Sequence, residues 1–461
     1  MEEKNAPAAV PNAAGSAAAA KADRKTAAGA SALVFLLYMG YRLYAMTKLL
    51  AGRFSFLDML SYAWWTLCRG KAFHSLDYGM GFVPRALTGQ LLTLVTGGAI
   101  TERAAGIYLL LAYVLTYALF SVVVGILIEK AVRTENYIMA MFPFLFVLAP
   151  VPVWFRSFMF ANYDTFMLLF ALLAFLALAQ SRHERLLWLV PVFSCLGILT
   201  NYAFALLFFP LIFALQYYAY IQSGLKKSRL AQLLATTGSS GALALYSVAA
   251  PYNSEWMHRL GLYRYSCAQA IAYLEGKLGH VLEEADRLYI ANTVFGMDAR
   301  GDSFVAIPPG RLTAFSPLAG WFHPKFYGNA LLICAPIVVF TCIAWWVMAK
   351  GETGFLKKSP FYLFMLAPCF IFPAFMVFQD LDRLVWSVLL TQLLLMIYVF
   401  LKNGQSGVFN RMREITKKDK PAIAGIAVFF LAILLPLLIF KTGEWLNAHP
   451  GNWGDVLESI A

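Results

Sequence analysis

The sequence predicts an all-α, polytopic membrane protein: a transmembrane helical bundle of about eleven spans. Composition provides two of the observations, since 60% of the 461 residues are hydrophobic and only 13% are charged, whereas soluble domains carry roughly 25% charged residues. The third is that the apolar residues gather in runs of roughly 20, the length of helix that crosses a bilayer. The mean hydropathy of +0.65 excludes a disordered chain, and the runs exclude a single soluble domain.

The apolar runs mark where the helices are expected. Residues 30–250 are predicted to form the transmembrane core, interrupted by one outward loop, and residues 328–440 its C-terminal transmembrane helices. Individual spans are expected at roughly 31–50, 106–128, 137–155, 165–180, 187–200, 202–220, 230–250, 328–349, 360–378, 384–401 and 421–440.

Polar segments lie between and beyond these runs. Residues 1–29, rich in Ala and Lys, are predicted to be a disordered cytoplasmic tail. Residues 51–105 form the first outward loop, in which Phe54–Cys68 is rich in Trp and Tyr and suits helices that lie in the interface plane. Residues 251–327 are expected to form a small helical extracytoplasmic cap, and residues 441–461 an extracytoplasmic tail.

The distribution of basic residues predicts the orientation, because cytoplasmic loops carry an excess of Lys and Arg. The short loops on one side of the expected bundle are consistently basic, whereas most other positive charges fall in the two long outward loops. We therefore expect a multi-pass cell-membrane protein with a cytoplasmic N-terminus and an extracytoplasmic C-terminus. The net charge of +12 follows from this topology, so the lipid bilayer is an expected partner and nucleic acid is not. The short inner loops contribute Lys130, Arg133, Arg182, Arg185, Lys226, Lys227, Arg229, Lys350, Lys357, Lys358, Arg411, Arg413, Lys417, Lys418 and Lys420.

The cysteines and histidines indicate no metal site, because no Cys/His cluster has zinc spacing. We expect no cofactor; a divalent metal is compatible with the acidic residues, but no motif indicates one. Cys68 and Cys267 lie in polar stretches, where they either form a disulfide or remain thiols. The cytoplasmic loops are short and contain no Gly-rich phosphate loop, so the activity is expected on the outer face.

The most unusual segment is Asp77–Gly89, which reads DYGMGFVPRALTG. Its glycines allow a tight backbone path, and Pro84 suits the first turn of a helix with Arg85 just inside it. Backbone N–H groups at a helix N-terminus attract anions, so an Asp before the turn and an Arg in the helix suit the binding of an anion. The alternative is an ordinary interfacial turn capped by Asp77.

A second cluster, Arg156, Asn162 and Asp164, lies at the expected outer junction of the third and fourth spans. A carboxylate that enters a span is costly and usually has a partner or a function. The alternative is that Asp164 caps the start of the fourth span.

A third cluster, Asp380, Asp382 and Arg383, joins the ninth and tenth spans, where it serves either a site or a self-paired cap. Asn201 lies between the fifth and sixth spans. All these residues map to the outer membrane level, where they combine carboxylates, which suit acid–base chemistry, with arginines, which favour phosphate. We therefore expect one site there, with Asp77 as the catalytic base and Asp164 as the alternative base. The expected substrate- and phosphate-binding residues are Arg85, Arg156, Asn162, Asn201, Asp380, Asp382 and Arg383.

This architecture resembles the GT-C superfamily of polytopic membrane glycosyltransferases over roughly residues 30–330, by fold-level analogy. Its members have many spans, a first outward loop with interfacial helices and an essential acid, and a later outward cap. The acidic pair usual near the first span is replaced here by two single acids, Asp58 and Asp77. The Asp77–Gly89 segment also resembles uncharacterised bacterial polytopic membrane proteins.

The resemblance implies a glycosyltransferase that moves a sugar from a polyprenyl-phosphate donor to a cell-envelope acceptor, which is a glycan, a lipid or a protein. Nucleotide sugars are not available outside the cell, so an outward-facing transferase needs a lipid-carried donor. A polysaccharide polymerase or ligase is the nearest alternative. A transporter or flippase for a lipid-linked or anionic substrate is the alternative of another class, although the sequence shows no internal repeat of the kind that many transporters have.

Overall fold

The computed structural model describes a helical protein, which confirms the predicted α class. One short antiparallel hairpin accompanies the helices: strand β1 (Met297–Arg300) pairs with strand β2 (Ser303–Ala306). The structure describes residues 25, 27–36, 74–148, 163–180, 184–300, 303–306, 324–367, 370, 381–404 and 407–418.

The helices overlap the predicted apolar runs. The described part of the first run belongs to the helix Ala27–Leu36, whereas the last run, 421–440, lies outside the described residues. The labelled helices are η1 (Tyr78–Met80), α3 (Leu87–Thr96), α4 (Glu102–Arg133), α5 (Tyr137–Leu148), α7 (Asp164–Gln180), η2 (Glu184–Trp188), α8 (Leu189–Thr200), α9 (Phe204–Leu207), α10 (Phe209–Gln222), α11 (Lys227–Tyr252), α12 (Ser254–Arg259), α13 (Cys267–Leu278), α14 (Glu284–Phe295), α16 (Pro324–Gly351), α17 (Phe355–Leu366), α19 (Leu381–Asn403) and α20 (Gly407–Lys418).

Two of the described helices, α4 and α11, are each long and apolar enough to cross a membrane. Helices α19 and α20 supply a third crossing if a bent pair counts as one span. The apolar helices Ala27–Leu36, α3 and α7 are shorter, and prolines interrupt α5 at Pro143 and α17 at Pro360. The described residues therefore support a membrane protein, while the bundle of about eleven spans remains a prediction.

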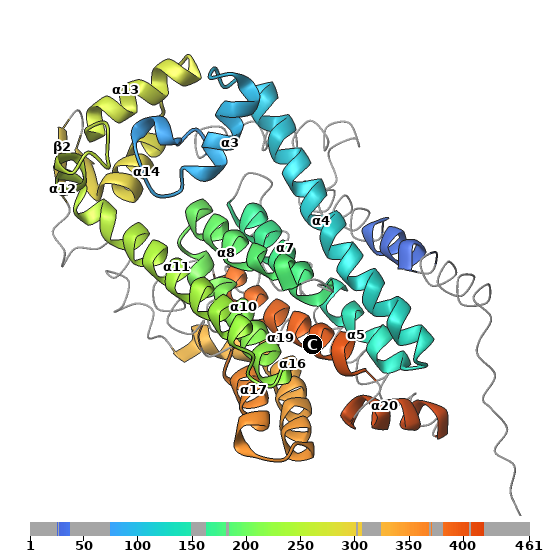
Figure 1. Ribbon diagram of the computed structural model, residues 1–461. Coiled ribbons are helices and arrows are strands. Elements are labelled where there is room, and N and C mark those ends of the chain that lie inside the picture. Colours follow the sequence, from blue (N-terminus) through green and yellow to red (C-terminus); the bar gives the residue numbers. More distant parts are fainter. Residues whose placement is uncertain are drawn as a thin grey trace, which may run out of the picture.

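Helix α19 lies inside the bundle, in contact with α4, α5, α7, α10 and α16 (Figure 1). Every residue from 387 to 400 is buried, which suits a helix that is apolar on nearly all sides. The amide of Gln392 in this helix is paired on both sides: its Nε2 donates to the carbonyl of Phe364 at 2.9 Å, and its Oε1 accepts from Trp345 Nε1 at 2.8 Å. Because a buried amide needs these partners, the pairing determines how α19 faces α16 and α17.

A second, smaller core lies at one end of the molecule, where buried residues of η1, α3, α13 and α14 pack together and Met257 of α12 packs against them (Figure 1). The described part of the predicted cap is therefore mostly helical, with the β1–β2 hairpin added after α14. Its core is shared with the first outward loop, since Leu76 and Met80 pack with Ile271 and Leu274 of α13. The loop and the cap were expected as separate segments, but their described residues share one core, as suits segments that are each too small to bury a core alone.

Cys267 is one of the two cysteines that the sequence left either paired or free. This residue begins α13 as a buried free thiol, and Cys68 lies outside the described residues. Burial raises the pKa of Cys267 to about 12, which makes it an unreactive thiol, because only the thiolate is a good nucleophile.

The helix ends that carry the short basic loops meet at the end of the bundle opposite the cap (Figure 1). Lys130 Nζ, near the end of α4, donates to the carbonyl of Leu401 at 2.5 Å. Lys402 Nζ, near the end of α19, donates to the carbonyl of Ala179 in α7 at 3.0 Å. We call this region the basic end, and it includes Lys130, Lys226, Lys350, Lys402 and Arg411.

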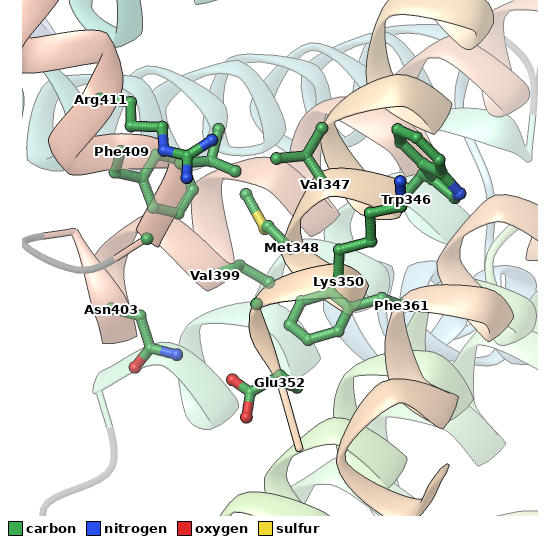
Figure 2. Close-up of a pocket in the computed structure, with 13 residues that line it drawn as sticks. Trp346, Val347, Met348, Lys350, Glu352, Phe361, Val399, Asn403, Phe409 and Arg411 are labelled. Atoms are coloured by element: carbon green, nitrogen blue, oxygen red, sulfur yellow. The ribbon is translucent and has the colours of Figure 1, made fainter. Parts of the chain in front are cut away.

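A pocket of about 570 Å³ lies at the basic end (Figure 2). It is bordered by the C-terminal parts of α16 and α19, by α17 and by the first half of α20. None of the residues predicted to form the outer site lines it.

Candidate functional site

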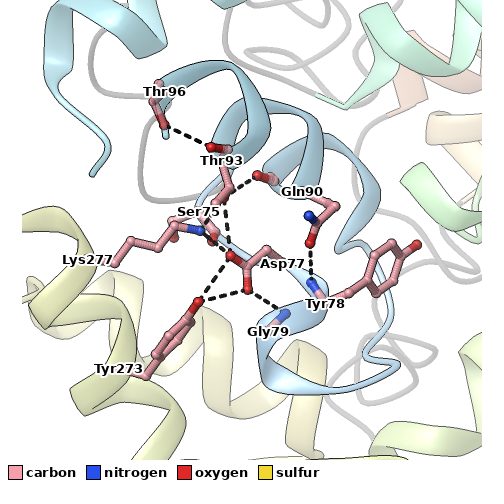
Figure 3. Close-up of polar contacts among 10 residues, drawn as sticks. Ser75, Asp77, Tyr78, Gly79, Gln90, Thr93, Thr96, Tyr273 and Lys277 are labelled. Atoms are coloured by element: carbon pink, nitrogen blue, oxygen red, sulfur yellow. Dashed lines mark hydrogen bonds and ion pairs between the residues drawn. The ribbon is translucent and has the colours of Figure 1, made fainter. Parts of the chain in front are cut away.

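The carboxylate of Asp77 lies in a polar cluster that joins η1, α3 and α13 (Figure 3). Asp77 caps η1, its Oδ1 accepting a hydrogen bond from the backbone N–H of Gly79 at 2.9 Å. Nζ of Lys277 lies 2.5 Å from Oδ2, and the hydroxyls of Tyr273 and Thr93 are each 3.2 Å from the same oxygen. Asp77 therefore links the first outward loop to the cap.

Lys277 is equally well paired. Its Nζ has three acceptors for its three N–H groups: Oδ2 of Asp77, Oγ1 of Thr93 at 2.5 Å and the carbonyl of Ser75 at 2.9 Å. The side chains of Lys277 and Asp77 are only 5% and 3% exposed. Burial lowers the pKa of Lys277, and the hydrogen bond to Asp77 opposes this shift. In the described part of the chain, Asp77 thus acts as a helix cap and an ion-pair partner.

Arg85 lies in a second cluster, which consists of tyrosines from three elements. Its guanidinium carbon is 4.9 Å from the ring centre of Tyr202, 5.8 Å from that of Tyr289 and 6.0 Å from that of Tyr163. Nη1 of Arg85 also donates to the hydroxyl of Tyr289 at 2.8 Å. Tyr163 precedes α7, Tyr202 follows α8 and Tyr289 belongs to α14. We call these four residues the Arg85 cage.

The charge of Arg85 has no acidic partner within 4 Å among the described residues. The tyrosine faces compensate the charge in part through cation–π interactions. The Nε atom of Arg85 is buried and makes no hydrogen bond within the described structure. Because buried donors are normally paired, an anion whose oxygen reaches Nε would complete the cage.

The backbone at Arg85 differs from the sequence prediction, which placed this residue inside the first helical turn. Helix α3 begins at Leu87, with Ala86 as its N-cap, and Pro84 and Arg85 form a turn ahead of it. Arg85 has φ +63°, a left-handed conformation that costs a non-glycine residue about 1–3 kcal/mol. The turn directs the guanidinium toward the tyrosines. Strain of this kind concentrates at ligand-binding and catalytic positions.

Asp164 adjoins the cage through its neighbour in the chain. It follows Tyr163 directly and is the first residue of α7, where a negative charge is favoured by the helix dipole. Its side chain is buried, at 1% exposure. Of the second predicted cluster, Asp164 therefore follows a residue that contacts Arg85.

Asn201 adjoins the cage in the same way, since Tyr202 follows it. Its Oδ1 accepts a hydrogen bond from the backbone N–H of Ala203 at 3.0 Å, and this Asx turn ends α8. Asn201 thus shapes the loop that carries Tyr202. The fold gathers the loops of Arg85, Asp164 and Asn201, whereas Asp77 contacts none of the cage tyrosines in the described contacts.

The structure does not describe the side chains of the remaining predicted site residues. Arg156, Asn162 and Asp380 lie outside the described residues. Asp382 and Arg383 belong to the first turn of α19, but their side chains lie outside the described structure. Their contribution to the site stays a prediction.

Sequence reasoning missed the cage tyrosines and the partners of Asp77. Aromatic residues make up 16% of the chain, so a single tyrosine carries little signal. Their positions in the chain would have been informative, because Tyr163 precedes Asp164 and Tyr202 follows Asn201, and both of these neighbours were predicted to belong to the site. Tyr273 and Lys277 stand four residues apart on one helix, so they share a face, and this spacing would have indicated a common partner.

The fold and this site define a helical protein, with apolar helices long enough to cross a membrane, that holds a partly buried cation among tyrosines. No protein-family model, curated protein or solved structure matches the chain. Within the described residues, no group of three or more His, Cys, Asp and Glu side chains is placed to hold a metal ion.

Proposed function

We propose that the chain is a polytopic membrane glycosyltransferase that moves a sugar from a polyprenyl-phosphate donor to an extracytoplasmic acceptor of the cell envelope. The observation that carries the proposal is the Arg85 cage, in which the guanidinium of a residue with a strained backbone has no acidic partner among the described residues. Arginine presents a planar fork of donors that matches phosphate. The long apolar helices α4 and α11 support the membrane part of the proposal, and the resemblance to the GT-C superfamily supports the transferase part.

In the proposed reaction, Arg85 binds the phosphate of the donor with Nε and its free N–H groups. The bond between the sugar carbon and the phosphate oxygen breaks, and its electron pair leaves with the phosphate. Arg85 stabilises the negative charge that grows on this leaving group. The acceptor hydroxyl oxygen bonds to the sugar carbon, and its proton passes to a carboxylate that acts as general base.

Asp164 is the base that the geometry supports best, because it directly follows Tyr163 of the cage. Asp77, the base expected first from the sequence, is paired with Lys277 and accepts hydrogen bonds from Tyr273 and Thr93. Both carboxylates are buried, but Asp164 adjoins the cage that would hold the donor phosphate, and a base must lie near the proton it removes. Asp77 then supports the site by holding the cap in place.

The proposed reaction requires that the cap lies outside the cytoplasm. The positive-inside rule assigns the basic end to the cytoplasm, and the cap lies at the opposite end of the bundle (Figure 1). The proposed topology has about eleven spans, a cytoplasmic N-terminus and an extracytoplasmic C-terminus.

Cysteine labelling tests this topology. In a variant without native cysteines, Lys227→Cys and Lys417→Cys are expected to be protected from a membrane-impermeant thiol reagent in intact cells. His280→Cys and Asn452→Cys are expected to be labelled, because the cap and the C-terminal tail lie outside. Permeabilised cells provide the control, in which all four positions react. Labelling with the opposite sidedness would refute the orientation and the proposed function with it.

The activity test uses the purified full-length protein, a synthetic polyprenyl-phosphate sugar and cell-envelope acceptors, with release of the lipid phosphate as the readout. Arg85→Gln is expected to lower the rate by roughly 10²–10³-fold, the usual loss when a donor to a developing negative charge is removed. Arg85→Lys is also expected to be slow, because a point charge does not replace the planar fork. The matched control is Arg264→Lys, an exposed arginine that lies 5.7 Å from the ring centre of Tyr265 in the cap and is expected to leave the rate unchanged.

The same assay separates the two candidate bases. Asp164→Asn is expected to lower the rate per folded molecule by roughly 10²–10⁴-fold. Asp77→Asn is expected to lower the fraction of protein that is folded and to leave the rate per folded molecule unchanged. The reverse result would restore Asp77 as the base. Extension of a polysaccharide by whole repeat units would indicate a polymerase or ligase. No turnover with any polyprenyl donor, together with substrate uptake into proteoliposomes, would refute the transferase and support a transporter.

A further inference from the structure

The pocket at the basic end has the size and lining of a ligand site that the proposed reaction does not use. Its volume of about 570 Å³ lies within the roughly 300–1,000 Å³ of small-molecule sites. Val347 and Met348 of α16 and Val399 of α19 form an apolar floor, flanked by Phe361 and Phe409 (Figure 2). Such a floor favours a ligand with hydrocarbon over a bare ion.

Two cations border this floor from different helices. Lys350 lies in the last turn of α16, with its Nζ 3.6 Å from the ring centre of Trp346. Arg411 of α20 is exposed and forms no ion pair within 4 Å among the described residues. Asn403 adds an amide, and Glu352 is the one carboxylate of the lining. The lining therefore carries a net positive charge and complements an anion.

Helix α20, which forms one wall, is amphipathic and anchored. Val408, Phe409 and Met412 share one face of the helix, and Phe409 packs on Phe400 with ring centres 5.1 Å apart. Nδ2 of Asn136 donates to the carbonyl of Phe409 at 2.9 Å. A basic amphipathic helix at the end of membrane-spanning helices is typical of the headgroup level. Its other basic residues are Arg413, Lys417 and Lys418.

We propose that this pocket binds the phosphate-bearing headgroup of an anionic phospholipid from the adjoining leaflet. Arg411 and Lys350 contact the phosphate, and the apolar floor holds the first carbons of the acyl chains. The two cations distinguish an anionic from a neutral lipid, and the floor distinguishes a lipid from a soluble phosphate ester. The proposal rests on the membrane location of the bundle and does not depend on the transferase reaction at the opposite end.

Binding of a phosphatidylglycerol with a fluorescent acyl chain to the purified full-length protein in non-ionic detergent tests the proposal. Arg411→Gln and Lys350→Gln are each expected to weaken binding by roughly tenfold or more, because each removes a charge-assisted contact. Val347→Phe is expected to weaken binding as well, because it fills the floor without changing any charge. Phosphatidylcholine with the same acyl chains should compete poorly, and glycerol 3-phosphate or inorganic phosphate at the same concentration should not compete.

The matched control is Lys357→Gln, an exposed lysine of α17 that does not line the pocket. It is expected to weaken binding by no more than roughly fivefold, the effect of one cation near a charged surface. Equal effects of Lys357→Gln and Arg411→Gln, with no effect of Val347→Phe, would refute a defined site. Competition by glycerol 3-phosphate as strong as that by phosphatidylglycerol would refute the lipid. The competition experiments use the wild-type protein, so they decide the question even if a variant fails to fold.

Discussion

Replacing Lys277 by Met is expected to lower the free energy of unfolding by about 3–5 kcal/mol, because it leaves the buried carboxylate of Asp77 without its counter-ion. The two side chains are 5% and 3% exposed and lie 2.5 Å apart. Asp77→Asn is expected to cost a similar amount, since the buried ammonium then loses its charge partner. Denaturant unfolding of the purified protein in detergent, followed by circular dichroism, measures both.

A second ion pair of the same helix is the matched control. Glu275 and Arg287 lie 2.6 Å apart, but their side chains are 21% and 34% exposed. Arg287→Met is therefore expected to cost at most about 1 kcal/mol. The double variant Asp77→Asn with Lys277→Met should recover part of the loss, because no buried charge remains unpaired. A cost for Lys277→Met as small as that for Arg287→Met would show that Asp77 does not need this partner.

Replacing Gly81 by Ala is expected to lower the free energy of unfolding by about 3–5 kcal/mol, through backbone strain and a steric clash together. Gly81 has φ +102° and ψ −170°, a region open essentially to glycine alone. It forms a β-bridge with Tyr263, and a Cβ there would overlap the carbonyl oxygen of Leu262 and lie 2.7 Å from the backbone nitrogen of Arg264. The same unfolding measurement tests the expected loss.

Gly261 provides the control for this second substitution. It also has a positive φ, +71°, but a Cβ there meets no atom within 4 Å. Gly261→Ala is therefore expected to lower the free energy of unfolding by about 1–2 kcal/mol, the cost of the left-handed backbone conformation without any steric clash. Equal losses for the two variants would show that the close approach of the first outward loop to the cap contributes nothing.

The two polar clusters show where sequence reasoning stops. The sequence allowed two interpretations of the Asp77–Gly89 segment, and a cap by Asp77 was one of them. A cap can be predicted from the sequence because it needs only a backbone N–H that is close in the chain. The pairing of Asp77 with Lys277 joins residues 200 positions apart, and the bond from Arg85 to Tyr289 joins residues 204 positions apart. Contacts at such separations leave no periodic trace in the sequence.

The position of Arg85 shows a second limit. A proline before a helix usually occupies its first turn, and the sequence therefore placed Arg85 inside the helix. The structure places it before the helix in a left-handed turn. That conformation is unfavourable by itself, and it is held by tertiary contacts with three tyrosines.

By itself, the sequence determined the helical class, the positions of the apolar helices and the gathering of basic loops on one side. These follow from composition and from the charge of short segments, which act locally and at the bilayer boundary. Only the tertiary structure decided that the first outward loop and the cap share a core, that Asp77 is paired with Lys277 and that Arg85 lies among tyrosines. Each of these depends on packing between distant segments, where burial and mutual orientation determine which polar groups meet.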